Sequence, residues 1–398
     1  MVEFDPARLD TAFHDNPYPV YRALQETAPF HRCPDGSLFL TRHADLDAVY
    51  RNRTHFSSDK EAAFGPKFGP DSPLFAHHTT SLVFRDPPYH TRVRRQIVGA
   101  LTPAAIRGIA EGLERLVDRL CRRMAERGEV DLIADFAAAI PVEVIGNLLG
   151  VPAEAREPLR DWSLAILGAL DPAPSADALA LGNRSVTEFL EFTAQLIAAR
   201  RAQPRGEADL LTRLITDASG GETLTDAELQ HNCIFLLNAG HETTTNLIGN
   251  ALALLLASPA AAADLRQHPQ IMGSAVEEFL RLESPNQLGN RLVVEPVEIG
   301  GERFASGTYL TLCIGAANRD PSVFAEPGRM DLRREPNRHL AFGAGGHACA
   351  GMSVARLEAT LALRAFLARF PAARLVPGAR RSQRARFRGY ATLPARLA

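Results

Sequence analysis

A cysteine in a glycine-rich segment offers the most specific chemistry in the chain. Cys349 lies in residues 342–351, a stretch with four glycines that runs directly into an expected helix over residues 352–370. Because glycine lacks a Cβ atom, such a backbone can pass close to a large flat group. The N–H groups and positive dipole end of the following helix favour a thiolate over a thiol. A single thiolate facing a planar cofactor can hold haem iron, and the alternative is a buried cysteine in a tight turn.

A polar interruption in an otherwise apolar helix is the second feature. A helix is expected over residues 229–255, and its interruption consists of Ala239, Gly240, His241, Glu242, Thr243 and Thr244. A buried carboxylate is costly unless it is used, and glycine costs about 1 kcal/mol relative to alanine in a helix. Thr243 can bond to a carbonyl one turn earlier, which would open a groove. An acid and a hydroxyl at such a groove could relay protons to bound dioxygen, whereas a polar stripe between helices is the alternative.

Charged residues elsewhere could support a haem site. Glu278 and Arg281 are three residues apart, so they can form an ion pair on one helix face, although such pairs are common. Haem carries propionates, and burying them requires arginine and histidine donors. The candidate donors are His90, Arg94, Arg291 and His347, with His339 as a further candidate.

Two other uses of the cysteine loop are disfavoured by its composition. A zinc site built from His339, His347 and Cys349 would have a single thiolate, whereas zinc usually takes three or four protein ligands with short paired spacings. A Cys–His hydrolase would need an oriented base. His347 is two residues from Cys349 and would compete with the backbone for that geometry.

The composition is that of a globular protein with room for a cofactor. The 398 residues are 46% hydrophobic and 23% charged, and the net charge of -2 argues against nucleic acid as the main partner. Five scattered cysteines without a CxxC pair fit a reducing cytoplasm rather than a disulfide framework. The N-terminal residues lack the features of a signal peptide, and residues 233–257 are too polar for a simple membrane span. We therefore expect a soluble, cytoplasmic protein.

Helical patterns dominate the chain, and most strand-like segments come late. Helices are expected over residues 17–28, 45–51, 106–127, 141–150, 176–201, 229–255 and 352–370. Strands are expected over residues 38–41, 291–299, 309–314 and 387–397. Residues 64–80, rich in Gly, Pro and His, indicate a long irregular loop, and Thr225 with Glu228 indicates a capping box. Because no repeat or flexible linker is visible, we expect a mainly α single domain with a small β portion over residues 1–398.

Together these motifs resemble the cytochrome P450 superfamily, specifically its soluble bacterial type. The family's cysteine signature, phenylalanine-x-x-glycine-x-(arginine or histidine)-x-cysteine-x-glycine, is met by Phe342, Gly345, His347, Cys349 and Gly351. The helix signature of a small residue, glycine, any residue, an acid and threonine is met over residues 239–243. Glu278 and Arg281 match the ExxR pair, and residues 86–95 and 317–321 resemble two further family segments. The resemblance covers nearly the whole chain.

The resemblance implies a cytochrome P450 fold, haem b (iron-protoporphyrin IX) as cofactor and Cys349 as the thiolate ligand of its iron. It implies that Glu242 and Thr243 deliver protons, with Thr244 as a secondary candidate, and that Glu278 and Arg281 are structural. The residues implied to bind the cofactor are His90, Arg94, Ala239, Gly240, Arg291, Phe342, Gly343, His347, Cys349 and Gly351. The sequence departs from the family at Ala350, where a larger aliphatic residue is commoner, and at Gly346. Both departures would leave roomier surroundings for the thiolate.

The implied reaction is monooxygenation by O2 with electrons from a separate protein. The sequence shows no flavin or nicotinamide fingerprint, so a ferredoxin-type electron donor is expected, with Arg92, Arg95 and Arg356 as candidate contacts. A hydrogen-peroxide-driven peroxygenase is the first alternative, although such enzymes typically lack the acid–threonine pair. A haem-binding module that recruits partners without catalysis is the second.

The implied substrate is a small-to-medium apolar or aromatic molecule. The family's pocket positions here are mainly apolar and fall in residues 64–83, 162–170, 288–290 and 389–390 and at Leu236 and Ala239. A polar or acidic end of the substrate could be bound by His77, His78, Thr79 and Ser81, but the favoured interpretation of these four is a solvated loop tip. The protein is expected to be a monomer.

Overall fold

The computed structural model describes residues 3–101, 103–205, 209–216 and 223–397. The chain divides into two compact units. We call the first the sheet-bearing unit; it consists of Met1–Phe56, Leu113–Ile140 and Thr243–Ala398. The second, the helical unit, consists of Ser57–Gly112 and Pro141–Glu242. That the chain acts as the single domain expected from its sequence stays a prediction.

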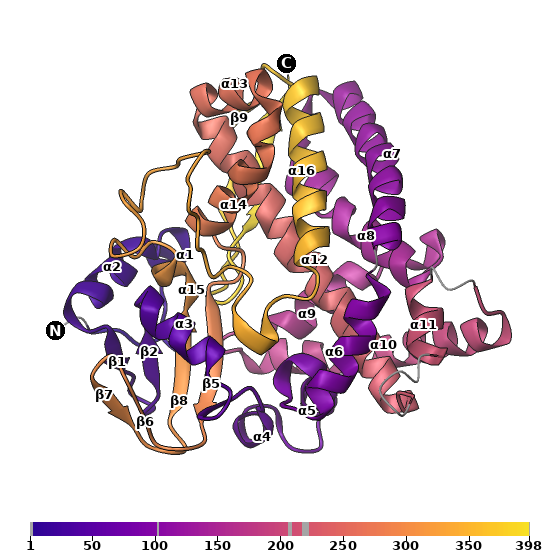
Figure 1. Ribbon diagram of the computed structural model, residues 1–398. Coiled ribbons are helices and arrows are strands. Elements are labelled where there is room, and N and C mark those ends of the chain that lie inside the picture. Colours follow the sequence, from indigo (N-terminus) through magenta and orange to yellow (C-terminus); the bar gives the residue numbers. More distant parts are fainter. Residues whose placement is uncertain (1–2, 102, 206–208, 217–222, 398) are drawn as a thin grey trace. The chain divides into compact units, whose positions relative to one another are not determined.

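The largest sheet has the strand order β1-β2-β8-β5-β3. Strand β2 (Leu38–Leu40) pairs antiparallel with β1 (Phe30–Arg32) and parallel with β8 (Tyr309–Cys313). Strand β5 (Leu288–Val293) is antiparallel to β8, and β3 (Phe56–Ser57) is the edge strand. All of β2 is buried, as expected for an inner strand with both faces covered. Figure 1 shows β1, β2, β8 and β5 side by side.

Smaller sheets complete the β portion. They are formed by β4 (Glu129–Asp131) with β12 (Pro394–Arg396) and β9 (Arg374–Leu375), by β10 (Arg380–Arg381) with β11 (Tyr390–Thr392), and by β6 (Val297–Ile299) with β7 (Glu302–Phe304). The segment 291–299, predicted as one strand, is therefore the end of β5 followed by β6. The predicted tail strand contains both β11 and β12.

Helices form most of the helical unit and are the commonest regular element of the sheet-bearing unit. Those within the sheet-bearing unit are α1 (Thr11–Asp15), α2 (Tyr18–Thr27), α3 (His43–Arg51), η2 (Ile133–Ala137), α13 (Pro259–Gln267), η4 (Pro269–Ile271), α14 (Met272–Leu282), α15 (Ile314–Ala317), η5 (Gly345–His347) and α16 (Met352–Arg369). Those within the helical unit are α4 (Glu61–Phe68), α5 (Pro73–Thr80), η1 (Leu82–Phe84), α6 (Tyr89–Ala100), η3 (Ala153–Ala155), α9 (Leu159–Gly168), α10 (Ala176–Ala202) and α11 (Leu210–Thr216). Three helices contribute residues to both units: α7 (Pro103–Arg127), α8 (Ala139–Leu149) and α12 (Asp226–Ala257). The mainly α fold with a small β portion is confirmed.

The long helix α12 begins as the sequence predicts. The N–H of Glu228 donates to the Thr225 hydroxyl at 3.2 Å, and the N–H of Thr225 donates to the Glu228 carboxylate at 2.8 Å. This reciprocal pair is the predicted capping box. Within the described ranges, no single helix has both the length and the apolar composition needed to cross a membrane, and α12 and α13 meet that test only as a pair bent by 107°.

Residues 64–80 are helical, so the predicted irregular loop is wrong. Helix α4 ends at Gly69, whose φ of +85° favours glycine, and α5 starts with Pro73 in its first turn. The Ser72 hydroxyl caps α5 by accepting the N–H of Phe75 at 3.1 Å. Gly69 and Pro73 thus mark the ends of two short helices, whereas Gly65 and Pro66 lie inside α4.

Candidate functional site

The cysteine loop is closed by its own backbone. The N–H of Cys349 donates to the carbonyl of Phe342 at 2.9 Å. Gly343 and Gly345 have φ values of +65° and +67°, which favour glycine. A Cβ atom on Gly345 would also collide with the carbonyl oxygen of Tyr50 in α3. These glycines are therefore required by the loop's own conformation and by its contact with α3.

Cys349 is the accessible cysteine of this chain. The other four, Cys33, Cys121, Cys233 and Cys313, are buried, whereas Cys349 is partly accessible. Burial raises the pKa of Cys233 and of Cys313 to about 12, so these thiols stay protonated. Cys349 also lies three residues before the start of α16, where the helix dipole favours negative charge. Its position suits a ligand thiolate better than that of any other cysteine.

Arg356 on α16 places a positive charge close to Cys349. Its guanidinium lies 4.8 Å from the centre of the Phe342 ring, and its Nε and Nη2 each donate to Glu277 of α14 at 2.7 Å. The hydrogen bond to Glu277 is the main reason that the pKa of Arg356 is raised, and the charge of Cys349 raises it further. This arrangement favours the thiolate form of Cys349.

Glu277 holds His339 as well as Arg356. The Nε2 atom of His339 lies 3.1 Å from the Glu277 carboxylate. Burial would raise the pKa of Glu277, but the hydrogen bonds from Arg356 and His339 outweigh it and lower the pKa to about 2. Because His339 is already held by this carboxylate, it is a poor candidate for binding a propionate. The zinc alternative also lacks support, since the described residues contain no group of three or more His, Cys, Asp or Glu side chains that could hold a metal ion.

Tyr50 connects Arg291 to the cysteine loop. The Arg291 guanidinium lies 5.1 Å from the centre of the Tyr50 ring, and the Tyr50 carbonyl is the group packed against Gly345. Arg291 lies inside β5 rather than at the start of a strand, and its Nη1 donates to the carbonyl of Asn290 at 2.8 Å. Within the sheet-bearing unit, Tyr50 of α3 therefore lies against both Arg291 and the cysteine loop. Sequence reasoning missed Tyr50.

Helix α12 is buried through its middle except along one face. Between residues 231 and 253, the positions that are not buried are Phe235, Leu236, Ala239, Gly240 and Thr243. Their spacing places them on one side of a helix with 3.6 residues per turn. We call this side the open face of α12. A Cβ atom on Gly240 would meet Ile145 only at an ordinary 3.7 Å, so packing within the protein does not require glycine there.

The three candidate catalytic residues differ in their relation to the open face. Thr243 belongs to it, and Glu242, which is 4% exposed, lies at its border one turn after Ala239. Thr244 is 3% exposed and lies outside the face. The geometry therefore places Thr243 on the face, whereas Glu242 and Thr244 both border it, since Thr244 lies one turn after Gly240 as Glu242 does after Ala239.

His90 and Arg94 lie one turn apart on α6, so they share a helix face. His90 is 4% exposed, and Arg94 is partly accessible. The start of the helix is fixed by Asp86, which accepts the N–H of Ser58 at 2.9 Å, and by Tyr89, whose hydroxyl donates to the carbonyl of Thr80 at 2.6 Å. His90 and Arg94 can therefore bind one group together. That this group is a haem propionate stays a prediction, for these two residues and for His347.

Glu278 and Arg281 form the predicted ion pair in a fully buried setting. Two hydrogen bonds of 2.7 Å join the Arg281 guanidinium to the Glu278 carboxylate, and both side chains are 0% exposed. Arg281 also donates to the carbonyls of Asn318 and Pro327, and Arg334 pairs with Glu278 at 3.1 Å. The pair therefore ties α14 to the chain that leads to the cysteine loop, which is the structural role expected from the sequence.

The histidines of the predicted loop tip are not solvated. His77 and His78 are each 2% exposed, and Ser81 is 1% exposed. The ring centres of His77 and His78 are 5.0 Å apart, and the ring centre of His231 in α12 lies 5.6 Å from that of His77. The interpretation of these residues as a surface tip is wrong, because α5 turns them toward the interior of the helical unit.

Comparison with known proteins gives a consistent result. The family model described as Cytochrome P450 matches residues 177–374. The chain is 33% identical over 369 residues to the biotin biosynthesis cytochrome P450 of Bacillus subtilis, covering 91% of each chain. It is 34% identical to the vitamin D(3) 25-hydroxylase of Pseudonocardia autotrophica, covering 92% of this chain and 89% of that one.

A solved structure agrees with these relatives over nearly the whole chain. It is P450BioI in complex with an acyl carrier protein ligated to hexadec-9Z-enoic acid. The similarity has a TM-score of 0.91 at 32% identity and covers 97% of this chain and 100% of that chain. The predicted fold is therefore confirmed along almost its full length.

Proposed function

Since the chain belongs to the cytochrome P450 superfamily of haem-dependent oxidoreductases, we propose that it is a monooxygenase in which Cys349 is the thiolate ligand of haem b. The observation that carries this assignment is that the one accessible cysteine lies in the closed, glycine-rich loop immediately before α16. The described residues fit the cofactor, because α12 keeps an open face of small and apolar residues within an otherwise buried helix. When bound, haem supplies the activation of dioxygen, which thiolate ligation favours.

Glu242 and Thr243 would supply protons to the reaction. Thr243 lies on the open face of α12, and Glu242 lies at its border with the protein interior. A carboxyl in that position can receive a proton from the interior and pass it to the Thr243 side of the helix. The remaining candidates, His90, Arg94, Arg291 and His347, would hold the propionates by charge-assisted hydrogen bonds. Ala239, Gly240, Phe342, Gly343 and Gly351 would line the cofactor without charge.

The substrate would be a small-to-medium apolar molecule, because the open face presents Phe235, Leu236 and Ala239 next to the relay. Trp162 of α9 was assigned to the pocket from the sequence. Its ring lies 4.8 Å from that of Phe189 and its Nε1 donates to Glu188 at 2.7 Å, so it is held by α10. Two similar proteins, one in complex with an acyl carrier protein that carries hexadec-9Z-enoic acid and one named for vitamin D(3) hydroxylation, favour lipid-like compounds over small aromatics as first candidates.

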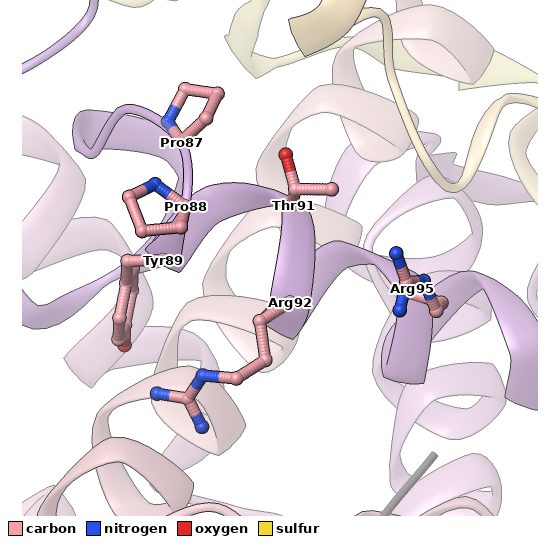
Figure 2. Close-up of a pocket in the computed structure, with 6 residues that line it drawn as sticks. All are labelled: Pro87, Pro88, Tyr89, Thr91, Arg92 and Arg95. Atoms are coloured by element: carbon pink, nitrogen blue, oxygen red, sulfur yellow. The ribbon is translucent and has the colours of Figure 1, made fainter. Parts of the chain in front are cut away.

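Electrons would come from a separate ferredoxin-type protein. A surface cavity of about 630 Å³ at the start of α6 is lined by Pro87, Pro88, Tyr89, Thr91, Arg92 and Arg95 (Figure 2). Arg92 is paired with Glu228, and Arg356 with Glu277, so their charges are partly compensated. Arg95 is exposed, and no ion pair with it occurs among the described residues. Arg95 is therefore the candidate contact best suited to an acidic partner.

The partner contact is tested by reversing this charge. Arg95→Glu should slow reduction of the haem by a plant-type ferredoxin roughly 10-fold at low salt and less at high salt, because steering charges are screened. The matched control is Arg107→Glu on α7, which changes the same charge outside the cavity. Equal rates for Arg95→Glu and the wild type at low salt would remove Arg95 from the docking surface.

The monooxygenase assignment is tested by binding and turnover. A panel of fatty acids, steroids, terpenoids and aromatic compounds is screened for a low-to-high-spin shift of the haem. The compound with the largest shift is then incubated with O2, ferredoxin, its reductase and NADPH, or with hydrogen peroxide alone. Oxygenated product mainly in the first mixture supports the monooxygenase, and product only with peroxide supports the peroxygenase alternative. Binding without product in either mixture would favour the non-catalytic module. A cytoplasmic location and a monomeric state also stay predictions.

A further inference from the structure

Asn238 and His241 are buried polar side chains of α12 for which the described residues offer no hydrogen-bond partner. Asn238 and His241 are each 2% exposed, and both amide atoms of Asn238 and both ring nitrogens of His241 lack hydrogen bonds in the described part of the chain. A buried polar atom without a partner costs about 1–3 kcal/mol. Four such atoms on neighbouring side chains are unusual, and ordered water is the ordinary way to satisfy them.

These side chains lie directly behind Glu242. Asn238 is three residues before His241 and four before Glu242, so it neighbours both on the helix surface. On its other side, Glu242 neighbours Ala239 and so borders the open face. Glu242 thus separates a buried polar face of α12, formed by Asn238 and His241, from the face that carries Thr243.

Helix α9 carries two further polar groups of the helical unit. Burial is the main cause that lowers the pKa of His241 to about 3, and the positive charge of Arg160 on α9 lowers it further. Arg160 is itself partly accessible. One turn later on α9, the hydroxyl of Ser163 is buried and also lacks a hydrogen-bond partner within the described ranges. An accessible cation of α9 therefore acts electrostatically on the ring beside Glu242.

We propose that Asn238 and His241 hold ordered water behind Glu242, and that this water and the His241 ring return protons to the Glu242 carboxylate from the Arg160 side. The proposal rests on the proposed monooxygenase function and names the proton supply of that same site. A buried water needs two to four polar partners, which the four unpartnered atoms of Asn238 and His241 can provide. Asn238 and His241 act through Glu242 and are positioning residues.

The proton transfer balances without a change in the charge of His241. The held water passes one proton to one nitrogen of the neutral ring as it receives another from solvent, and the ring releases the proton of its other nitrogen through water to Glu242. The ring is then in its other tautomer and turns over before the next transfer. The carboxylate of Glu242 thereby regains the proton that it gave up, and no electron moves. A ring that held its own positive charge would be disfavoured at this buried position next to Arg160.

The first test compares His241→Phe, which removes both nitrogens, with His241→Gln, which keeps a donor and an acceptor. Holoprotein is supplied with the compound of largest spin shift, O2, ferredoxin, its reductase and NADPH. His241→Phe should lower product per NADPH at least ~5-fold and enlarge the effect of deuterated water on that ratio, whereas His241→Gln should recover most of the coupling. Peroxide-driven turnover, which needs no proton supply from the protein, should change little. If His241→Phe formed as much product per NADPH as the wild type, with the same effect of deuterated water on that ratio, the proposal would be overturned.

The second test does not depend on turnover. In protein labelled with 15N at histidine and held in the diamagnetic ferrous–CO form, the His241 signals are those lost in His241→Phe. They should report a neutral, hydrogen-bonded ring whose N–H exchanges with water, and Asn238→Leu should perturb them. A ring without a hydrogen bond or exchange would overturn the proposal even in an active enzyme. Product absent from wild type would instead mean that the monooxygenase function itself fails. Asn238→Leu replaces His241→Phe in the turnover test if the latter does not fold.

Discussion

At the scale of single residues, Arg356 sets the electrostatic surroundings of Cys349. It is fixed on both sides, by the Phe342 ring at 4.8 Å and by two hydrogen bonds of 2.7 Å to Glu277. A fixed cation close to a thiolate stabilises the charged sulfur over the neutral thiol. Because a neutral thiol is a poor ligand for haem iron, the charge of Arg356 should help to keep the sulfur bound.

We therefore predict that Arg356→Met weakens thiolate ligation. The ferrous–CO form should shift in part from an absorption near about 450 nm to one near about 420 nm, and the shift should grow as pH falls. Arg356→Lys keeps the charge but loses the two-point contact with Glu277. Its ferrous–CO spectrum should therefore lie between those of Arg356→Met and the wild type. A spectrum identical to that of the wild type in Arg356→Met would show that this cation does not support the ligand.

The sequence singled out the candidate reactive residues, but it did not single out the residues that support them. Cys349, Glu242 and Thr243 stand out because their types conflict with, or are unusual in, their local surroundings. Tyr50 and Glu277 do not stand out, because their roles depend on contacts with residues far away in the chain. A tyrosine and a glutamate in amphipathic helices carry no local signal of such a contact.

At the scale of elements, α14 is held by a buried charge network. Glu278 accepts hydrogen bonds from Arg281, Arg334 and Asn337, and from the N–H of Asp331 at 2.9 Å. Removing the negative charge would leave Arg281 buried without its counterion. Breaking one partner of a buried pair typically costs about 3–5 kcal/mol.

We predict that Glu278→Gln lowers the free energy of unfolding by about 3 kcal/mol or more, and that much of the protein is recovered without haem. The measurement is urea unfolding followed by circular dichroism, with haem content from absorbance. The matched control is Glu26→Gln in α2, which breaks the exposed pair with Arg22 and should cost less than about 1 kcal/mol. Similar losses in the two variants would show that the buried pair has no special structural role.

Helices α5 and α12 meet at buried histidines. Burial lowers the pKa of His77 well below its ordinary value, as do the neighbouring rings of His78 and His231, and burial lowers the pKa of His231 to about 4. In the unfolded chain both rings titrate near about pH 6.5. The stability that comes from keeping them neutral is therefore fully present above that pH and is lost as the pH falls toward the folded values.

This predicts a specific loss of stability in mild acid. Between pH 7 and pH 5 each of these two histidines should lower the free energy of unfolding by up to about 2 kcal/mol. His231→Phe keeps a ring at this contact and should reduce the loss of unfolding free energy between pH 7 and pH 5 by up to about 2 kcal/mol. His268→Gln, at the exposed residue that follows α13, should leave that loss unchanged. Urea unfolding at both pH values measures the difference. An unchanged fall in His231→Phe would contradict the assignment.

Elements with a clear period and caps were predicted well. The capping box at Thr225 and the long apolar pattern predicted α12, and Gly351 marks the start of α16. The prediction failed at residues 64–80, because short helices capped by proline, serine and glycine have the composition of a loop. Buried histidines there could not be anticipated without knowing which helix they face.

At the scale of the whole molecule, the chain has the fold of the cytochrome P450 superfamily, and its local features agree with that family at widely separated points. The closed loop of Cys349, the buried Glu278–Arg281 pair and the open face of α12 come from different parts of the sequence. We propose that a thiolate-ligated haem is what they have in common, so the ligand is the claim on which the other assignments depend.

The most direct test of that claim is the spectrum of the reduced protein under carbon monoxide. Wild-type protein should give a Soret maximum near about 450 nm, which reports a thiolate opposite the carbon monoxide. Cys349→His, which offers a neutral nitrogen ligand in the same loop, should give a maximum near about 420 nm, and Cys313→Ser, at a buried cysteine of β8, should keep the wild-type maximum. A wild-type maximum near about 420 nm in freshly prepared holoprotein, or an unchanged maximum in Cys349→His, would contradict the assignment of Cys349 as the haem ligand.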